Sequence, residues 1–262
     1  MLKTIDHTKH LMAKTLKIMA PPGYGTVVPL DTKAHAGMGL LTENNFVWCG
    51  MLNAVFLNAA EFSRASLDFP IAFTRDEQNG EFIPVAVLGL KAKQNLFVDA
   101  EGRWRERAYI PAFFRRFPFC IAEIPMPDGH AAQRMICVQE NRLVKNATPL
   151  FSSDGTPTNA WPPILKLLEA IEGARQQTRV LLRRLEALGL LTPFDAIAVP
   201  RNGAQLRLKG MFRVDEQKLQ AIPAKDLRVM LKKGELRAVY AHLISLENFA
   251  RLMDMNQSQA KH

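Results

Sequence analysis

The first half of the chain consists of short apolar runs that are separated by turn-forming residues. Gly, Pro, Asp and Asn punctuate the runs, a pattern that is typical of β-strands joined by turns. We therefore predict strands over residues 26–30, 46–57, 71–74, 83–90, 96–98, 119–124 and 135–139.

Two segments of this half depart from the pattern and predict short helices. Residues 58–68 begin with Asn58 and carry Glu61 three positions later, as in a capping box. Residues 110–116 have Pro111 in the first turn, where proline is favoured.

The second half is mainly helical, with a long helix predicted near 160–188. Pro162 and Pro163 suit its first turn, and Gly189 suits its end. Apolar side chains recur every three or four positions and so form a stripe along one face. The stripe consists of Ile164, Leu167, Leu168, Ile171, Ala174, Thr178, Leu181, Leu185 and Leu188. Beside it lie Arg175, Arg179 and Arg183, either as a solvated flank or as an anion or partner site.

Beyond the long helix the pattern returns briefly to strands. Residues 194–199 and 204–214 read as strands, and 201–203 as the hairpin turn between them. Gly210 marks a bulge in the second strand. We predict the remaining helices after Asp215, after Pro223 and over residues 235–253.

Because strands come first and the long helix follows, the order of elements is segregated, which indicates an α+β fold. We expect an N-terminal, mainly antiparallel β-sheet region packed against a C-terminal helical region. The length of 262 residues suits one sizeable domain. The expected divisions are a tail or amphipathic helix over 1–23, one domain over 24–253 with any seam at 145–163, and a C-terminal tail over 254–262.

Composition is that of a folded protein, with 48% hydrophobic and 23% charged residues. No apolar run is long enough for a transmembrane helix. Lysines interrupt residues 1–23, so we see no signal peptide and expect a cytoplasmic location. Three cysteines without a CxxC spacing predict neither a disulfide framework nor a zinc site.

The chain carries a net charge of +9. A basic balance invites a nucleic-acid interpretation. The positive charge is dispersed, however, and no nucleic-acid motif occurs, so we do not expect such a partner.

Common catalytic and cofactor motifs are absent from the sequence, which has no HExxH, P-loop, GxGxxG or GxSxG pattern. We therefore predict no cofactor, no metal site and no identifiable catalytic residue. Whether the chain is an enzyme stays open, although the missing motifs lower that expectation.

Residues 103–119 interleave arginines with aromatic side chains and have the strongest claim to function. Arginine binds carboxylates and phosphates through paired hydrogen bonds and stacks on aromatic rings. The candidate residues for a ligand or partner are Arg103, Trp104, Arg107, Tyr109, Arg115 and Arg116. In the structural alternative the aromatic rings fill the core, and the arginines face water or pair with Glu101 and Glu106.

His242 completes this candidate set, because histidine titrates near neutrality. Its structural alternative is a neutral, hydrogen-bonded core histidine. Glu61 and Asp68 lie seven residues apart on one predicted helix face, either as an acid pair or as a cap and a surface charge.

Several segments carry a resemblance to a known family. Residues 89–104 read GLKAKQNLFVDAEGRW, and residues 109–119 read YIPAFFRRFPF. Further matching segments lie at 24–30, 61–71, 149–155 and 241–246, the last reading AHLISL. In this order they resemble the bacterial SapC-like family, which is named for a surface-layer locus and is distinct from a transport permease of the same name. The resemblance covers roughly residues 24–253.

The resemblance implies fold more than function, since no well-defined reaction is attached to the family. It implies a non-enzymatic binding or accessory protein linked to the bacterial surface layer or cell envelope. One alternative is a small-ligand-binding protein or enzyme with a pocket at 103–119; a second is a nucleic-acid binder. The expected partner is a protein or an anionic small ligand, and the sequence leaves the oligomeric state open.

Overall fold

The computed structural model describes residues 18–41, 45–77, 79–124, 133–198 and 206–259. The chain forms two compact units. Unit 1 comprises residues 1–44 and 116–172, and unit 2 comprises residues 45–115 and 173–262. The domain limits expected from the sequence stay a prediction.

Unit 1 is built on a three-stranded antiparallel sheet with the strand order β1-β7-β6. These strands are β1 (Val27–Pro29), β6 (Phe119–Ile124) and β7 (Gln133–Gln139). A small antiparallel pair joins β2 (Gly39–Leu40) to β8 (Leu143–Val144), which follows η4 (Glu140–Arg142). One face of the larger sheet packs into a core with Phe151 and Trp161.

Unit 2 contains a five-stranded antiparallel sheet with the order β3-β5-β4-β10-β9. Its strands are β3 (Ala54–Phe56), β4 (Ile71–Arg75), β5 (Phe82–Val87), β9 (Leu191–Ala198) and β10 (Leu206–Val214). The register of β9 and β10 shifts between Leu208 and Met211, which confirms the bulge at Gly210.

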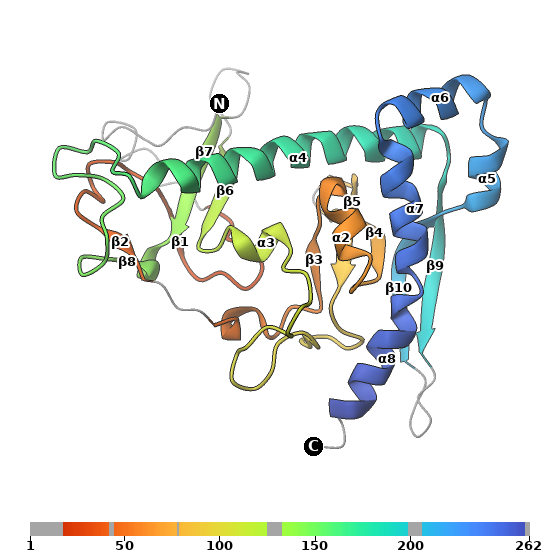
Figure 1. Cartoon of the computed structure of the whole chain (residues 1–262), viewed down its shortest axis with the longest axis horizontal. Coiled ribbons are helices and arrows are strands. Elements are labelled where there is room, and N and C mark those ends of the chain that lie inside the picture. The colour runs from red at the N-terminus through yellow and green to blue at the C-terminus, as the bar shows by residue number, and fades with distance from the viewer. Residues whose placement is uncertain (1–17, 42–44, 78, 125–132, 199–205, 260–262) are drawn as a thin grey trace. The chain divides into compact units, whose positions relative to one another are not determined.

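Helices of unit 2 cover this sheet. In Figure 1, α7 (Glu235–Ser245) and α8 (Asn248–Gln259) run beside β10 and β9, and contacts place α7 against β4 and β10 and α8 against β9. The shorter helices are η1 (Val47–Cys49), η2 (Ala59–Glu61), α2 (Phe62–Ala65), α3 (Ala112–Arg115), α5 (Glu216–Ala221) and α6 (Ala224–Lys232).

Side-chain hydrogen bonds cap two of the predicted helix starts. The Glu61 carboxylate accepts a hydrogen bond from the backbone N–H of Asn58 at 3.0 Å, which satisfies a free donor at the start of η2. The Asp215 carboxylate accepts from the backbone N–H groups of Gln217 and Lys218, as expected for an N-cap residue.

The long helix α4 spans Trp161–Ala187. Its apolar stripe is the protected face, since Leu168, Leu181 and Leu185 are buried. Antiparallel sheets drawn mainly from the first half, with a helical second half, confirm the expected α+β fold.

Three sequence-based predictions of elements are wrong. Residues 46–57 form η1, a turn and the short β3 instead of one strand. Residues 96–98 form a turn region with a single bridge, because their partner is a local loop rather than a sheet. The helix predicted over 235–253 is divided into α7 and α8 by a turn at 246–247.

The predicted hairpin turn at 201–203 lies outside the described residues. Of the tail or helix expected over 1–23, only residues 18–23 are described, and they contain no helix. Within the described parts of the chain, no helix is both long and apolar enough to cross a membrane.

Candidate functional site

A tight loop in unit 2 forms the first part of the candidate site. The Arg105 N–H donates to the Phe97 carbonyl at 2.8 Å, and Val98 and Trp104 form an antiparallel bridge. The turn at the end of this loop needs Gly102, whose φ is +77° and where a Cβ would lie 2.4 Å from a Val47 methyl. The loop therefore places Phe97 and Arg105 side by side.

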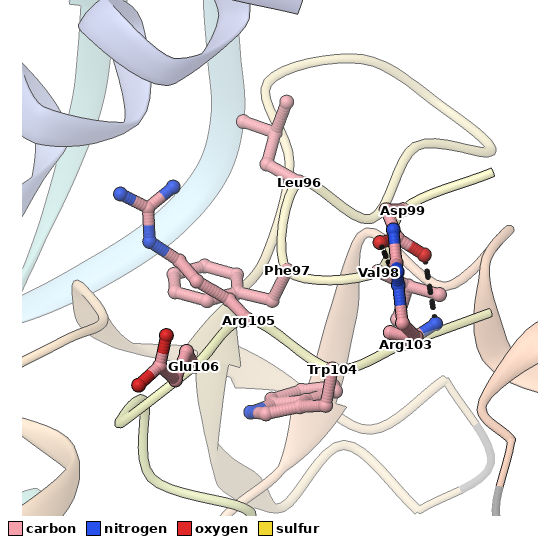
Figure 2. A pocket seen from close by; sticks show the side chains of 8 residues that line it. All are labelled: Leu96, Phe97, Val98, Asp99, Arg103, Trp104, Arg105 and Glu106. Atoms are coloured by element: carbon pink, nitrogen blue, oxygen red, sulfur yellow. Dashed lines mark hydrogen bonds and ion pairs between the residues drawn. The ribbon is translucent and has the colours of Figure 1, made fainter. Parts of the chain in front are cut away.

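This loop lines an open cavity of about 600 Å³. Its lining consists of Leu96, Phe97, Val98, Asp99, Arg103, Trp104, Arg105 and Glu106. Figure 2 shows the Phe97 and Trp104 rings among the lining side chains, and the two rings stack with centroids 5.9 Å apart. The volume lies in the range of small-molecule sites.

Charged groups on the cavity fall into two classes. Arg103 is neutralised locally, because its Nε lies 2.8 Å from Asp99 and its Nη2 lies 3.0 Å from Glu101. Hydrogen bonds from the Arg103 backbone and side chain hold the pKa of Asp99 below its usual range.

Arg105 differs, because its guanidinium makes no hydrogen bond or ion pair with any residue that the structure describes. In Figure 2 its side chain extends past the Phe97 ring, away from the joined Asp99–Arg103 pair. The Glu106 carboxylate and the Arg105 guanidinium both lie at the left of Figure 2, and no dashed line joins them. A free cation beside an aromatic wall is the main feature of this site.

Arg107 lies just beyond the lining residues. It is 91% exposed, pairs with Glu106 at 3.6 Å, and has a φ of +62°, a left-handed conformation that is uncommon for residues other than glycine. Local strain of this kind occurs at functional loops.

The Trp104 ring of the cavity lining packs against further aromatic side chains. The Trp104 ring lies 5.3 Å from that of Phe46 and 5.0 Å from that of Phe114, which is buried. The Trp104 Nε1–H donates to the Ala108 carbonyl at 3.3 Å. The aromatic residues of the segment thus fill a core, as in the structural alternative, while Trp104 also reaches the cavity.

Tyr109 and Arg115 belong to a second cluster, centred on the buried carboxylate of Glu61. This carboxylate accepts hydrogen bonds from the Tyr109 hydroxyl at 3.0 Å and the Ala112 N–H at 2.6 Å, and Arg115 Nη2 lies 3.8 Å away. Asp68 joins through the Tyr109 N–H, whose donor distance is 2.9 Å. Burial and the Glu61 charge raise the pKa of Tyr109 to about 12. Glu61 and Asp68 therefore fix the position of residues 109–112.

The two adjacent arginines of the segment belong to different units. Arg115 lies in unit 2, whereas Arg116 lies in unit 1, where its charge acts on Tyr24 and Cys120.

His242 is fully buried in unit 2 on α7. Its Nδ1 lies 2.8 Å from the Ile71 carbonyl, and its Nε2 accepts from the Val214 N–H at 3.1 Å. Both ring nitrogens are therefore occupied by the strands β4 and β10. Burial lowers its pKa to about 4, so the ring is neutral at pH 7.

The structure thus brings only Arg103 and Trp104 of the sequence-predicted residues to the cavity. Sequence reasoning missed Phe97, Asp99 and Arg105, although all three lie within the motif-bearing segment. The Asp99–Gly102 turn was the available signal, since a turn returns the chain along itself. Among the described residues, no three His, Cys, Asp or Glu side chains form a group suited to a metal ion.

The chain was also compared with known proteins. No match was found among the curated proteins or among the solved structures. The SapC family model matches residues 30–252, which is most of the chain and includes both the cavity loop and the AHLISL segment of His242. On this match, the protein belongs to the SapC family.

Proposed function

We propose that this chain is a non-enzymatic binding protein whose cavity receives a small anionic molecule with a flat apolar part. The free guanidinium of Arg105 beside the Phe97 and Trp104 rings carries this proposal. Guanidinium groups pair with carboxylates, sulfonates and phosphates, and aromatic walls favour flat apolar groups.

The loop supports such binding because it is held in place before the ligand arrives. Backbone hydrogen bonds join the two arms of the loop, one with Phe97 and the other with Arg105, and Asp99 fixes Arg103 and the turn. A preorganised site loses less conformational freedom on binding. Glu106, which pairs with the exposed Arg107 at 3.6 Å, also lies among the lining residues, and its carboxylate disfavours a polyanion.

The cavity chemistry supports binding over catalysis. Among the lining residues that the structure describes, there is no histidine, cysteine or hydroxyl side chain. Of its two carboxylates, Asp99 is kept ionised by Arg103, and a carboxylate with a lowered pKa is a poor proton acceptor near neutrality.

Titration with anilinonaphthalene sulfonate tests the proposal, since this probe combines an aromatic surface with one anion. We expect saturable binding to the native chain and a roughly 10-fold or greater loss of affinity in Arg105→Gln, as expected for losing a charge-assisted hydrogen bond. Arg228→Gln is the control, because Arg228 is an exposed arginine of α6 away from the lining residues. Equal affinities of Arg105→Gln and the native chain, at equal melting temperatures, would refute the site.

The proposed cellular setting rests on the resemblance to a family named for a surface-layer locus. We propose a cytoplasmic protein whose bound molecule or partner is connected with the cell envelope. Fractionation of cells that make the chain, followed by native mass spectrometry, tests both parts. Recovery in the envelope fraction would contradict the cytoplasmic location, and recovery without any bound molecule would remove support for the connection.

A further inference from the structure

Cys120 and Cys137 lie directly opposite each other in the β6–β7 ladder of unit 1. The next hydrogen bond along the ladder runs from the Gln139 N–H to the Pro118 carbonyl at 3.0 Å, so the cysteines occupy a hydrogen-bonded pair position. Cα atoms in such pairs are about 5.5 Å apart, and disulfides span about 4.4–6.8 Å between Cα atoms. The pair can therefore be bridged without moving the strands far.

The two thiols share the sheet face that is turned away from the main core of unit 1. Phe119 and Ile136 lie on the core face, whereas the cysteines cluster with Val27 under Ile18, Ala20 and Tyr24. Among the described residues, the cover consists of Ala122 of β6 and residues 18–24, which have no helix or strand. Local opening of such a segment requires less free energy than global unfolding. A small oxidant can therefore reach thiols that are buried in the closed state.

The surroundings distinguish the two sulfur atoms. A hydrogen bond from the Cys137 thiol, together with the charge of Arg116, holds the pKa of Cys120 below its usual value. The same hydrogen bond and burial raise the pKa of Cys137. Cys120 is thus the thiolate-forming partner, and Cys137 the proton donor beside it.

We propose that Cys120 and Cys137 form a peroxide-reactive dithiol that closes to an intrachain disulfide. The Cys120 thiolate attacks one oxygen of hydrogen peroxide, the O–O bond breaks, and Cys120 becomes a sulfenic acid while hydroxide leaves and takes up a proton to form water. The Cys137 sulfur then displaces the sulfenic oxygen as a second water, which forms the S–S bond. The two thiols lose two electrons to the peroxide.

Cys49 is the internal control. It is also buried, but it belongs to unit 2, its thiol donates to the Phe46 carbonyl at 3.1 Å, and burial raises its pKa to about 12. Neither of the other two cysteines belongs to its unit. It should stay reduced while the pair reacts.

The test exposes the full native chain to hydrogen peroxide, stops the reaction, and counts free thiols after denaturation. Native chain should fall from three thiols to one, become lighter by two hydrogen atoms, and recover all three with dithiothreitol. The Cys49→Ser variant should fall from two thiols to none. Cys137→Ser should instead retain a sulfenic acid on Cys120 that dimedone labels, and Cys120→Ser should give no such label.

The thiol count of the native chain decides the proposal even where a variant does not fold. Retention of all three thiols in the native chain would overturn it, as would a disulfide that includes Cys49. Loss of Cys49 at the same rate as the pair would also overturn it, because reaction would then follow general unfolding.

Discussion

His242 shows how one side chain can be tied to the stability of a sheet. It binds β4 through the Ile71 carbonyl and β10 through the Val214 N–H, and these strands are neighbours only in the folded state. Ser245, one turn further along α7, accepts from the Ile71 N–H at 2.9 Å. The histidine and serine of the AHLISL segment therefore anchor the helix to the sheet.

Acid should weaken this anchor. Burial lowers the pKa of His242 from 6.5 to about 4, so between these pH values the unfolded chain binds a proton that the folded chain does not. Stability therefore falls as pH drops through this window, by up to about 3 kcal/mol from this group. Urea unfolding between pH 7 and pH 4.5 measures the loss.

The control for this measurement is His242→Gln. The variant should be less stable at pH 7 but should lose less of its remaining stability on acidification, because the titrating ring is gone. Equal pH slopes for the two chains would show that other groups cause the acid sensitivity.

Glu61 is the second residue whose replacement should matter. Its carboxylate is 7% exposed and accepts from Asn58, Tyr109 and Ala112, so Glu61→Gln should cost roughly 1–3 kcal/mol by placing a donor where acceptors are needed. Thermal melts measure the effect. The matched change Glu106→Gln, at a side chain 88% exposed, should stay within about 0.5 kcal/mol of the native chain. Similar losses for both would contradict a structural role of the Glu61 cluster.

Among the elements, α4 was the most predictable. Apolar residues that recur every three or four positions over a long segment predict both a helix and the face that it buries. Leu181 is 3% exposed, whereas the Arg183 side chain is 66% exposed and pairs with Glu81 at 2.8 Å. The arginine flank is therefore an ion-paired surface in part, since Arg179 also contacts Glu81 at 2.9 Å.

Replacing Leu181 or Arg183 should show which face of α4 is buried. Leu181→Ala should destabilise the protein by about 2–5 kcal/mol through the lost burial and the remaining cavity. Arg183→Ala should cost less than about 1 kcal/mol, since exposed ion pairs contribute little. Differential scanning calorimetry measures both, and equal melting temperatures would mean that the buried face has been misassigned.

The two mispredicted strands are segments in which apolar residues pack outside a long sheet strand. Residues 96–98 have the composition of a strand, yet Phe97 stacks on Trp104 and its carbonyl pairs with Arg105 within a local loop. Local composition predicts that a residue prefers burial, but the fold of the rest of the chain determines which residues bury it.

In unit 2, strands that are distant in sequence should open together, with similar free energies of opening. The amides of Ile71 and Val214 donate to side chains of α7 at 2.9 Å and 3.1 Å. In hydrogen exchange, peptides containing either amide should exchange slowly and at comparable rates, because both open only with the sheet. Peptides covering the exposed Glu106 and Arg107 should exchange fast. Fast exchange at Val214 alone would show that β10 opens independently of β4.

The sequence predicted the long helix α4, the caps at Asn58 and Asp215, and most of the strands. Each of these features depends on neighbours within a few residues. The segregated order of strands and helices was sufficient for the α+β class. The motifs were sufficient for the SapC resemblance, which the family match confirms.

The neighbours of the candidate residues were decided by the folded chain instead. Burial of His242 on α7 keeps its ring neutral, the loop placed Arg105 beside Phe97, and the β6–β7 register set Cys120 against Cys137. Arg115 and Arg116, adjacent in the chain, instead belong to different units. Sequence patterns record the preference of each side chain for water or burial, whereas the identity of its neighbours depends on strand pairing and chain reversal, which only the folded chain establishes.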